Sequence, residues 1–269
     1  MAANISILMG IYNCASTLPE AIDSILAQTY TDWELIMCDD GSSDDTYAVA
    51  EAYCKRFPDK MVLLKNQRNM GLNYTLNHCL EAASGKYIAR MDGDDISLPQ
   101  RFEKELAALE EDPELSVVSC PMIYFDELGE RTMGRTICEY PIPDMLVHGP
   151  VHCHAPCMVR AETMRSVGGY SVDQRLLRVE DWHLWLKIYS AGGRGRNLPE
   201  ALYKMRDDRN AAGRRKFRYR LNEAYLTALV VKTLGLPKWK HLFVLRPILV
   251  GLLPKPIYQY LHKKKMQET

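Results

Sequence analysis

The sequence has no apolar run long enough to cross a membrane as a helix. A spanning helix needs about 18–20 consecutive apolar residues. The nearest candidate, Leu242–Leu253, is interrupted by Arg246 and Pro247. The first residues also lack the basic segment of a secretory signal. These absences argue against an integral membrane protein and predict a cytoplasmic chain.

Two common nucleotide-binding motifs are missing as well. The sequence contains neither G-x-G-x-x-G nor G-x-x-x-x-G-K-[ST], which disfavours a dinucleotide-binding fold and a P-loop NTPase. The eight cysteines are scattered, which predicts reduced thiols. Three histidines and two cysteines crowd His148–Cys157, but their spacing fits no paired zinc pattern. A core or substrate-lining segment is the preferred interpretation there.

The formal net charge of zero conceals an asymmetry along the chain. Residues 204–269 contain 16 Lys and Arg but only 4 Asp and Glu, whereas the preceding 203 residues contain 18 basic and 30 acidic ones. An acidic body followed by a basic tail predicts separate roles for the two parts.

Strand-like and helix-like segments alternate over the first 111 residues. Strands are expected at 5–9, 33–38, 61–65 and 87–91, and helices follow each of them. This alternation predicts an α/β fold with a mostly parallel sheet flanked by helices. Ligands bind at the carboxyl ends of the strands in such sheets. Tyr12-Asn13, Asp39-Asp40 and Asp92–Asp95 occupy those ends, so they should converge on one edge.

Asp92-Gly93-Asp94-Asp95 is the sharpest chemical signal. Carboxylates at a strand end can share Mg²⁺ or Mn²⁺ with the phosphates of a substrate. The alternative is a solvated acidic turn that caps the next helix. The neighbouring acidic strand ends favour the metal.

Two further acidic pairs invite functional interpretations. Asp40 could accept a hydrogen bond from a base or a ribose hydroxyl, although a plain turn explains it equally well. Glu180-Asp181 opens an apolar helix, where a carboxylate also complements the helix dipole. The functional alternative is a general base that takes a proton from an acceptor hydroxyl.

Taken in order, these segments resemble the family 2 glycosyltransferases of the GT-A fold, inverting enzymes of bacterial polysaccharide synthesis. The resemblance covers about residues 4–210 and leaves 211–269 as a basic and apolar helical tail. It rests on several segments: Gly10–Asn13, Ser24–Tyr30, Trp33–Ile36, Asp39–Asp44, Asn69–Leu72, Asp92–Asp95, Pro99–Phe102, Gly168–Tyr170 and Glu180–Trp182.

The resemblance implies a role for each candidate residue. Asp40 and the Tyr12 region, with Asn13 and Asn69, would hold the nucleotide, which is expected to be uridine diphosphate. Asp92 and Asp94 would contact the ribose, the metal and the diphosphate. Asp181 would be the base, with Glu180 as a cap or an acceptor ligand. Where many relatives carry a metal-binding histidine two residues after an arginine, this chain has Asp208.

The implied activity is transfer of a single sugar with inversion, from a nucleotide-sugar to a glycan or a lipid-linked acceptor. The chain lacks the Gln-x-x-Arg-Trp motif of processive synthases, and no nucleic-acid partner is expected. Two rivals remain: a non-catalytic sugar-nucleotide-binding module, and a nucleotidyltransferase. The latter should carry an N-terminal Gly-rich, basic loop, but the first turn here is Gly10–Cys14.

The tail from 211 to 269 admits two interpretations. It combines basic blocks with the apolar segment 242–253. Packing of a helix pair against the domain would account for the apolar residues. Peripheral attachment to an anionic membrane surface accounts for both features and is the favoured prediction.

Overall fold

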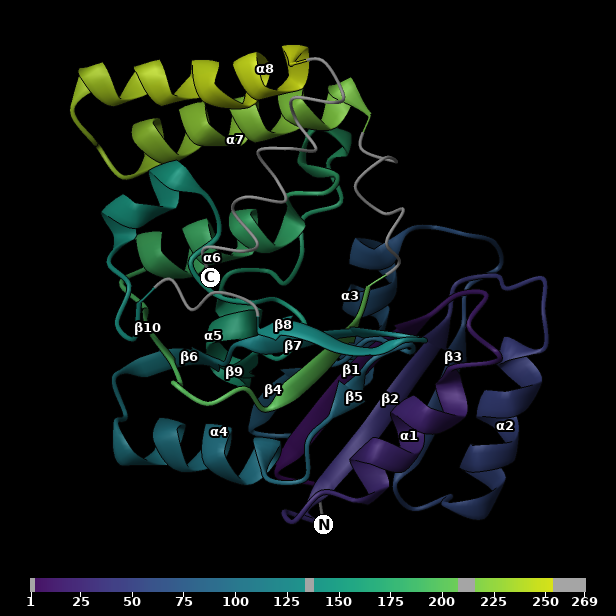
Figure 1. The fold of residues 1–269 in the computed structure, drawn as a ribbon. Helices are drawn as coiled ribbons and strands as arrows, with labels where there is room; N and C mark the ends of the chain where they lie inside the picture. Colours follow the sequence, from purple (N-terminus) through teal and green to yellow (C-terminus); the bar gives the residue numbers. More distant parts are fainter. Residues whose placement is uncertain (1–2, 134–137, 208–215, 254–269) are drawn as a thin grey trace.

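Side chains of the central strands divide between two hydrophobic cores. In β1 (Ile5–Ile11), Ile5, Ile7 and Met9 enter one core, whereas Leu8 enters the other. Successive side chains of a strand point to opposite faces, so an uninterrupted apolar run indicates a sheet covered on both sides. The computed structural model describes residues 3–133, 138–207 and 216–253 (Figure 1).

The main sheet has seven strands in the order β10-β6-β9-β4-β1-β2-β3. Strand β9 runs antiparallel to both of its neighbours, whereas every other neighbouring pair is parallel. The predicted mostly parallel sheet is therefore confirmed, with one reversed strand. Besides β1, its strands are β2 (Trp33–Asp39), β3 (Met61–Lys65), β4 (Tyr87–Arg90), β6 (Leu115–Ser119), β9 (Met158–Arg160) and β10 (Arg194–Asn197).

A second sheet, which the sequence patterns do not predict, lies in the order β5-β11-β7-β8. It pairs the last strand before the tail, β11, with a two-residue strand that follows the acidic turn, β5. This pairing brings the C-terminal end of β11 close to the acidic turn that follows β4. The strands are β5 (Ile96–Ser97), β7 (Met122–Asp126), β8 (Gly129–Met133) and β11 (Tyr203–Arg206).

Helices cover both faces of the main sheet. Residues of α1, α2 and α4 enter the first core, and residues of α3, α5, α6 and α7 enter the second. A helix follows each of the four predicted strands, and a further helix begins at Glu180, as the sequence predicts. The helices are α1 (Leu18–Leu26), α2 (Thr46–Arg56), α3 (Leu72–Ala82), α4 (Arg101–Glu111), α5 (Ala161–Ser166) and α6 (Glu180–Ser190), with short 3₁₀ turns η1 (Pro143–His148) and η2 (Gln174–Leu176).

The tail forms α7 (Phe217–Thr233), η4 (Lys238–Val244) and α8 (Leu245–Leu252). Figure 1 shows α7 and α8 side by side as the outermost layer. Leu226, Val230 and Val231 of α7 are buried in the second core with residues of α6, so α7 packs on the body. The predicted boundary near residue 210 falls outside the described residues and stays a prediction. Across the described ranges, none of the helices combines the length and apolarity that spanning a bilayer requires.

Candidate active site

The loops that follow β1, β2 and β4 meet at one edge of the sheet, as the sequence predicts. In the parallel register Ile11 lies opposite Asp39, and Leu8 lies opposite Arg90. Hydrogen bonds then join the loops. The Asn13 N–H donates to Ser42 Oγ over 3.0 Å, and Thr17 Oγ1 donates to the Gly93 carbonyl over 3.1 Å.

These loops line a cleft of about 320 Å³. Its walls include Tyr12 and Asn13 after β1, Asp92 and Asp94 after β4, and Arg206 at the end of β11. Gly93 lets the acidic turn approach the first loop, because a Cβ there would lie 3.0 Å from Cys14 Sγ and 3.1 Å from Ile11 Cγ2. Four of the residues predicted to bind donor or metal therefore share one cleft.

Asp40, the predicted nucleotide ligand after β2, does not line this cleft and is buried. Its buried carboxylate accepts hydrogen bonds from Asn66 Nδ2 at 2.8 Å, from the Met70 N–H at 2.8 Å and from the Gly71 N–H at 2.9 Å. The residue thus fastens the loop that presents the exposed Asn69. Three of the roughly four lone-pair directions of a carboxylate are taken by the protein. Direct contact between Asp40 and a base stays a prediction.

Asp92 is oriented by a buried arginine that the sequence patterns do not single out. Arg90, the last residue of β4, places Nη2 2.5 Å from Asp92 Oδ1. Its carbonyl accepts a hydrogen bond of 2.9 Å from buried Arg101, and Asp92 N–H donates to Tyr203 Oη over 3.2 Å. Arg90 holds only Oδ1, and the Asp92 side chain remains 24% exposed, so its role as a ligand of the donor or the metal stays a prediction.

Arg206 is the second functional candidate that sequence reasoning missed. Its Nε donates to the Asp94 carbonyl over 2.9 Å, its Nη2 bonds Glu20 Oε2 over 2.5 Å, and its guanidinium lies 4.5 Å from the centroid of the Phe125 ring. The available signal was its place in Arg206-Asp207-Asp208. It brings a fixed positive charge to the same cleft as Asp92 and Asp94.

Asp95, the last carboxylate of the turn, has a structural role. Its Oδ1 accepts the backbone N–H of Arg206 over 2.8 Å, which pins the end of β11 to the acidic turn. Burial, reinforced by the negative charges of Asp92 and Asp94, raises the pKa of Asp95 to about 8. Asp208, the remaining predicted metal ligand, lies outside the described residues.

Asp181 stands at the start of α6, half-buried. Burial and the neighbouring Glu180 charge raise the pKa of Asp181 to about 6, while Arg90 opposes that shift. The charges of Arg90, Asp181 and Asp92 all act on the Tyr170 phenol, whose pKa burial raises well above its usual range. Arg90 therefore lies within electrostatic reach of both Asp92 and Asp181.

Two histidines pack against the inner side of α6: both meet the Trp185 ring edge-on, and His152 also stacks on Tyr189. His154 Nε2 and Tyr170 Oη are 2.8 Å apart. His152 is hydrogen-bonded to Asn197 Oδ1 at 2.7 Å and to Tyr189 Oη at 3.0 Å. Burial lowers the pKa of His152 to about 4. Both histidines are thus part of the packed interior.

Glu180 differs from its neighbour. Its Oε2 is buried and, among the described residues, has no hydrogen-bond partner. Buried carboxylate oxygens are seldom left without one. No side chain caps the start of α6, so the capping role suggested for Glu180 is not observed, and its contact with an acceptor stays a prediction.

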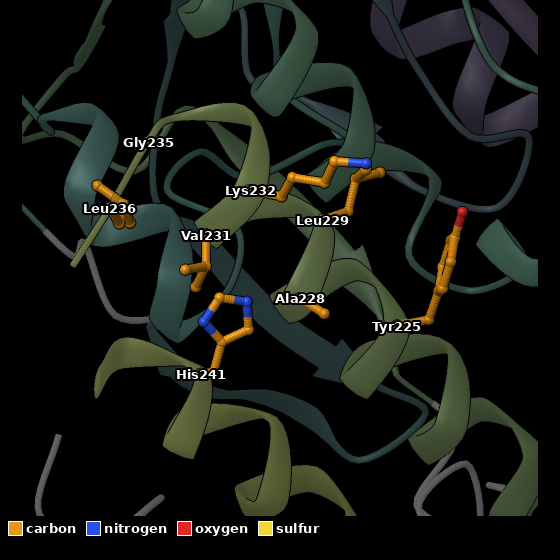
Figure 2. Close-up of a pocket in the computed structure, with 8 residues that line it drawn as sticks. All are labelled: Tyr225, Ala228, Leu229, Val231, Lys232, Gly235, Leu236 and His241. Carbon is orange, nitrogen blue, oxygen red and sulfur yellow. The ribbon is translucent and has the colours of Figure 1, made fainter. Parts of the chain in front are cut away.

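A larger cavity of about 500 Å³ lies elsewhere, between α7 and η4. Figure 2 shows His241 of η4 facing α7 side chains such as Val231 across it. It shares no lining residue with the cleft at the strand ends. The paired carboxylates and Arg206 make the smaller cleft the candidate active site.

Comparison with known proteins decides the family. The sequence profile described as glycosyl transferase family 2 matches residues 6–165. The chain belongs to family 2 of the glycosyltransferases. This family 2 glycosyltransferase is 42% identical over 262 residues to a Bacillus subtilis protein named as the glycosyltransferase EpsE, covering 97% of this chain and 94% of that one. It is 32% identical to the amylovoran biosynthesis glycosyltransferase AmsE of Erwinia amylovora, covering 96% and 98%.

Other relatives carry more specific descriptions. An Escherichia coli UDP-Glc:alpha-D-GlcNAc-diphosphoundecaprenol beta-1,3-glucosyltransferase, WfaP, is 25% identical, covering 97% of this chain and 98% of its own. The crystal structure of S. aureus TarS 1-349 with UDP-GlcNAc superposes with a TM-score of 0.71 at 17% identity, covering 92% of this glycosyltransferase and 72% of TarS. A Pyrobaculum calidifontis mannosyltransferase, in complex with GDP-Man and Mn²⁺, gives 0.65 at 17%, covering 98% and 80%. At 17% identity, both superpositions show a similarity of fold and nothing further.

Proposed function

We propose that this glycosyltransferase moves a single sugar, with inversion, from a UDP-sugar to a hydroxyl group of a glycan or lipid-linked acceptor. The observation that carries the proposal is Arg90, whose positive charge acts on a carboxylate of the cleft and on the proposed base. Arg90 bonds Asp92 in the cleft, and its charge acts on Asp181 at the start of α6. Donor and base would therefore occupy neighbouring parts of one site.

The residues divide the chemistry between them. Asp181 takes the proton from the acceptor hydroxyl, whose oxygen then forms a bond to the anomeric carbon of the sugar. The bond from that carbon to the diphosphate oxygen breaks, and the nucleoside diphosphate departs with the electron pair. Because the base acts on the face opposite the leaving group, the anomeric configuration inverts. Tyr170, on which the Asp181 charge acts, and Trp182 of α6 are both buried and would restrict water.

The residues of the cleft fit a divalent metal of the Mg²⁺ or Mn²⁺ type. Asp92 and Asp94 supply carboxylate oxygens, which these hard cations prefer, and substrate phosphates complete such sites. Within the described ranges, which leave out Asp208, no three His, Cys, Asp or Glu residues group as a metal site on their own. When bound, the metal would neutralise charge that develops on the departing diphosphate.

Arg206 is the residue proposed to bind the donor diphosphate. An arginine paired with a phosphate forms a charge-assisted hydrogen bond, worth about 1.5–3 kcal/mol. Arg206→Ala should therefore raise the Kd for UDP by about 10–100-fold, measured by titration calorimetry. Arg206→Lys keeps the charge without the planar fork and should recover part of the affinity. Wild-type affinity in a folded alanine variant would exclude this role.

Asp40 is the residue proposed to read the base, directly or through the loop it fastens. Asp40→Ala leaves Asn66 and two backbone N–H groups without their acceptor, which costs about 1–3 kcal/mol for each buried group. We expect a lower melting temperature and about tenfold weaker UDP binding. Calorimetry, performed where the variant is still folded, measures the second effect. An unchanged Kd would refute the assignment.

A donor-hydrolysis screen separates this function from its rivals. Nucleotide sugars are incubated with the protein, with and without Mn²⁺, and released nucleotide is measured. Hydrolysis of one donor class supports the transferase. Binding without turnover would indicate a non-catalytic module, and synthesis of a nucleotide-sugar from a sugar phosphate would indicate a nucleotidyltransferase.

The acceptor and the cellular location are proposed from the relatives and from the tail. WfaP is named for an acceptor on diphosphoundecaprenol, a lipid carrier. A lipid-linked acceptor of this kind would place the enzyme at the cytoplasmic face of a membrane, as a peripheral protein.

A further inference from the structure

A single apolar stripe crosses two consecutive helical segments of the tail. Its members are between 52% and 67% exposed, although all are large and hydrophobic. They are Trp239, Leu242, Leu245, Leu249 and Leu252. We call these five residues the apolar stripe.

The spacing of the apolar stripe changes together with the helix type. From Trp239 through Leu245 the interval is three residues, and this part belongs largely to the 3₁₀ helix η4, which has three residues per turn. The remaining intervals, of four and three residues, belong to α8, where such residues share a face. All five side chains therefore lie on one side of the layer.

The opposite side of this layer is fixed to the body. The Phe243 ring lies 4.6 Å, edge to face, from the ring of His148. Gly251 packs so closely on α7 that a Cβ there would lie 2.9 Å from Arg220 Cγ and 3.0 Å from the Phe217 ring. The apolar stripe is thus held outward by a packed inner face.

Basic residues outnumber acidic ones in the tail segment that carries the apolar stripe. Residues 216–253 include seven Lys and Arg but one acidic residue, Glu223, and its carboxylate lies 2.8 Å from Arg220 Nη1. Lys238 precedes Trp239 and Arg246 follows Leu245, and both are exposed, although Arg246 Nη1 donates to the His148 carbonyl over 3.4 Å. Lys240 instead pairs with Asp144 of the body at 2.8 Å. A symmetric dimer through this face would bring like charges together. An anionic lipid surface instead matches both the charge and the apolar side chains.

We propose that the apolar stripe, with Lys238 and Arg246 next to it in sequence, inserts into the interface of an anionic membrane. The proposal rests on the proposed function only for its biological setting, a lipid-linked acceptor. The sequence predicts membrane contact for the whole tail, and the present proposal limits that contact to one face of it. The outer face of η4 and α8 carries it, whereas α7 is partly buried in the second core.

The four tryptophans provide a direct probe. Trp33, Trp182 and Trp185 are at most 5% exposed, whereas Trp239 is 59% exposed. The full-length protein is mixed with vesicles of phosphatidylcholine and phosphatidylglycerol that contain brominated acyl chains. We expect quenching that Trp239→Phe abolishes. Absence of quenching, or quenching that persists in Trp239→Phe, would overturn the proposal.

Flotation with unbrominated vesicles tests the remaining residues. Leu242→Ser with Leu249→Ser should weaken binding by at least about tenfold, and Lys238→Gln with Arg246→Gln by a similar factor. Leu128→Ser is the control, because Leu128 is 80% exposed in the β7–β8 turn. Equal loss in the control, or binding that is indifferent to phosphatidylglycerol, would contradict the proposal, as would a change in oligomeric state of the leucine variants by light scattering.

The design separates this inference from the proposed function. The binding assays contain no nucleotide-sugar, so an inactive protein can still bind vesicles. The leucine variants should hydrolyse donor in solution as the wild type does. Active protein that does not bind refutes only the membrane face, and bound protein without transferase activity refutes only the function.

Discussion

Asp181→Asn is expected to lower the turnover number by ~10²–10⁴, the usual contribution of a general base. Asparagine keeps the size of the side chain but cannot accept the proton of the acceptor hydroxyl. The variant should fold, because it removes a charge that burial disfavours, as the raised pKa of Asp181 indicates. Nucleotide-sugar affinity should stay close to wild type. Single-turnover kinetics together with calorimetry measure the two quantities.

The pH dependence gives an independent check on Asp181. A general base is active when deprotonated, so turnover should fall as the pH drops through the pKa of Asp181, which is about 6. That acid limb should disappear in Asp181→Asn. Glu180→Gln is the matched control and should lower turnover less. If Glu180→Gln is the inactive variant, the base is misassigned, and if both variants stay active, the mechanism is wrong.

Asp94→Ala is expected to abolish divalent-dependent turnover, by about three orders of magnitude. A bound metal supplies several kcal/mol of charge stabilisation to a leaving diphosphate, and each 1.36 kcal/mol corresponds to a factor of ten in rate. Asp94 is exposed, so its loss should leave the melting temperature nearly unchanged. Donor hydrolysis over a Mn²⁺ titration measures the effect.

Asp59→Ala, at an exposed carboxylate outside the cleft, is the control for Asp94. It should retain wild-type turnover and the same Mn²⁺ dependence. Full activity of Asp94→Ala, or of the wild-type protein in excess chelator, would remove the metal from the mechanism.

Local patterns were sufficient to predict the strand ends that bring Tyr12, Asn13, Asp92 and Asp94 to the cleft. The apolar runs 5–9 and 33–38 ended in polar residues, and parallel strands bring such ends to one edge. The register of Ile11 with Asp39 confirms that reasoning. Reversal of β9 and the short pairing of β5 with β11 depend on partners far along the chain, which no local pattern encodes.

The same distinction separates the site residues that were predicted from those that were missed. Asp92 and Asp94 stand in a recognisable cluster. Arg206 reaches the cleft through a bond to Glu20, 186 residues away in sequence. In the sequence, nothing distinguishes Arg90 from other strand residues, and only the structure shows its side chain beside Asp92. Asp40 was predicted from its position to contact the nucleotide; the structure adds that its oxygens accept hydrogen bonds from the protein's own loop, and the nucleotide contact stays a prediction.

The position of strand β9 along the chain has a consequence for which segments related enzymes can exchange. Strand β9 lies near the end of the family match at residue 165, and α6 with Asp181 lies beyond it. Recombination between relatives at this point would exchange the part of the chain that carries Asp181 while keeping Asp92 and Asp94. Arg206, however, returns to the cleft from beyond the junction and bonds Glu20. A viable hybrid must therefore inherit a compatible pair at these two positions, which limits the exchanges open to evolution or to an engineer.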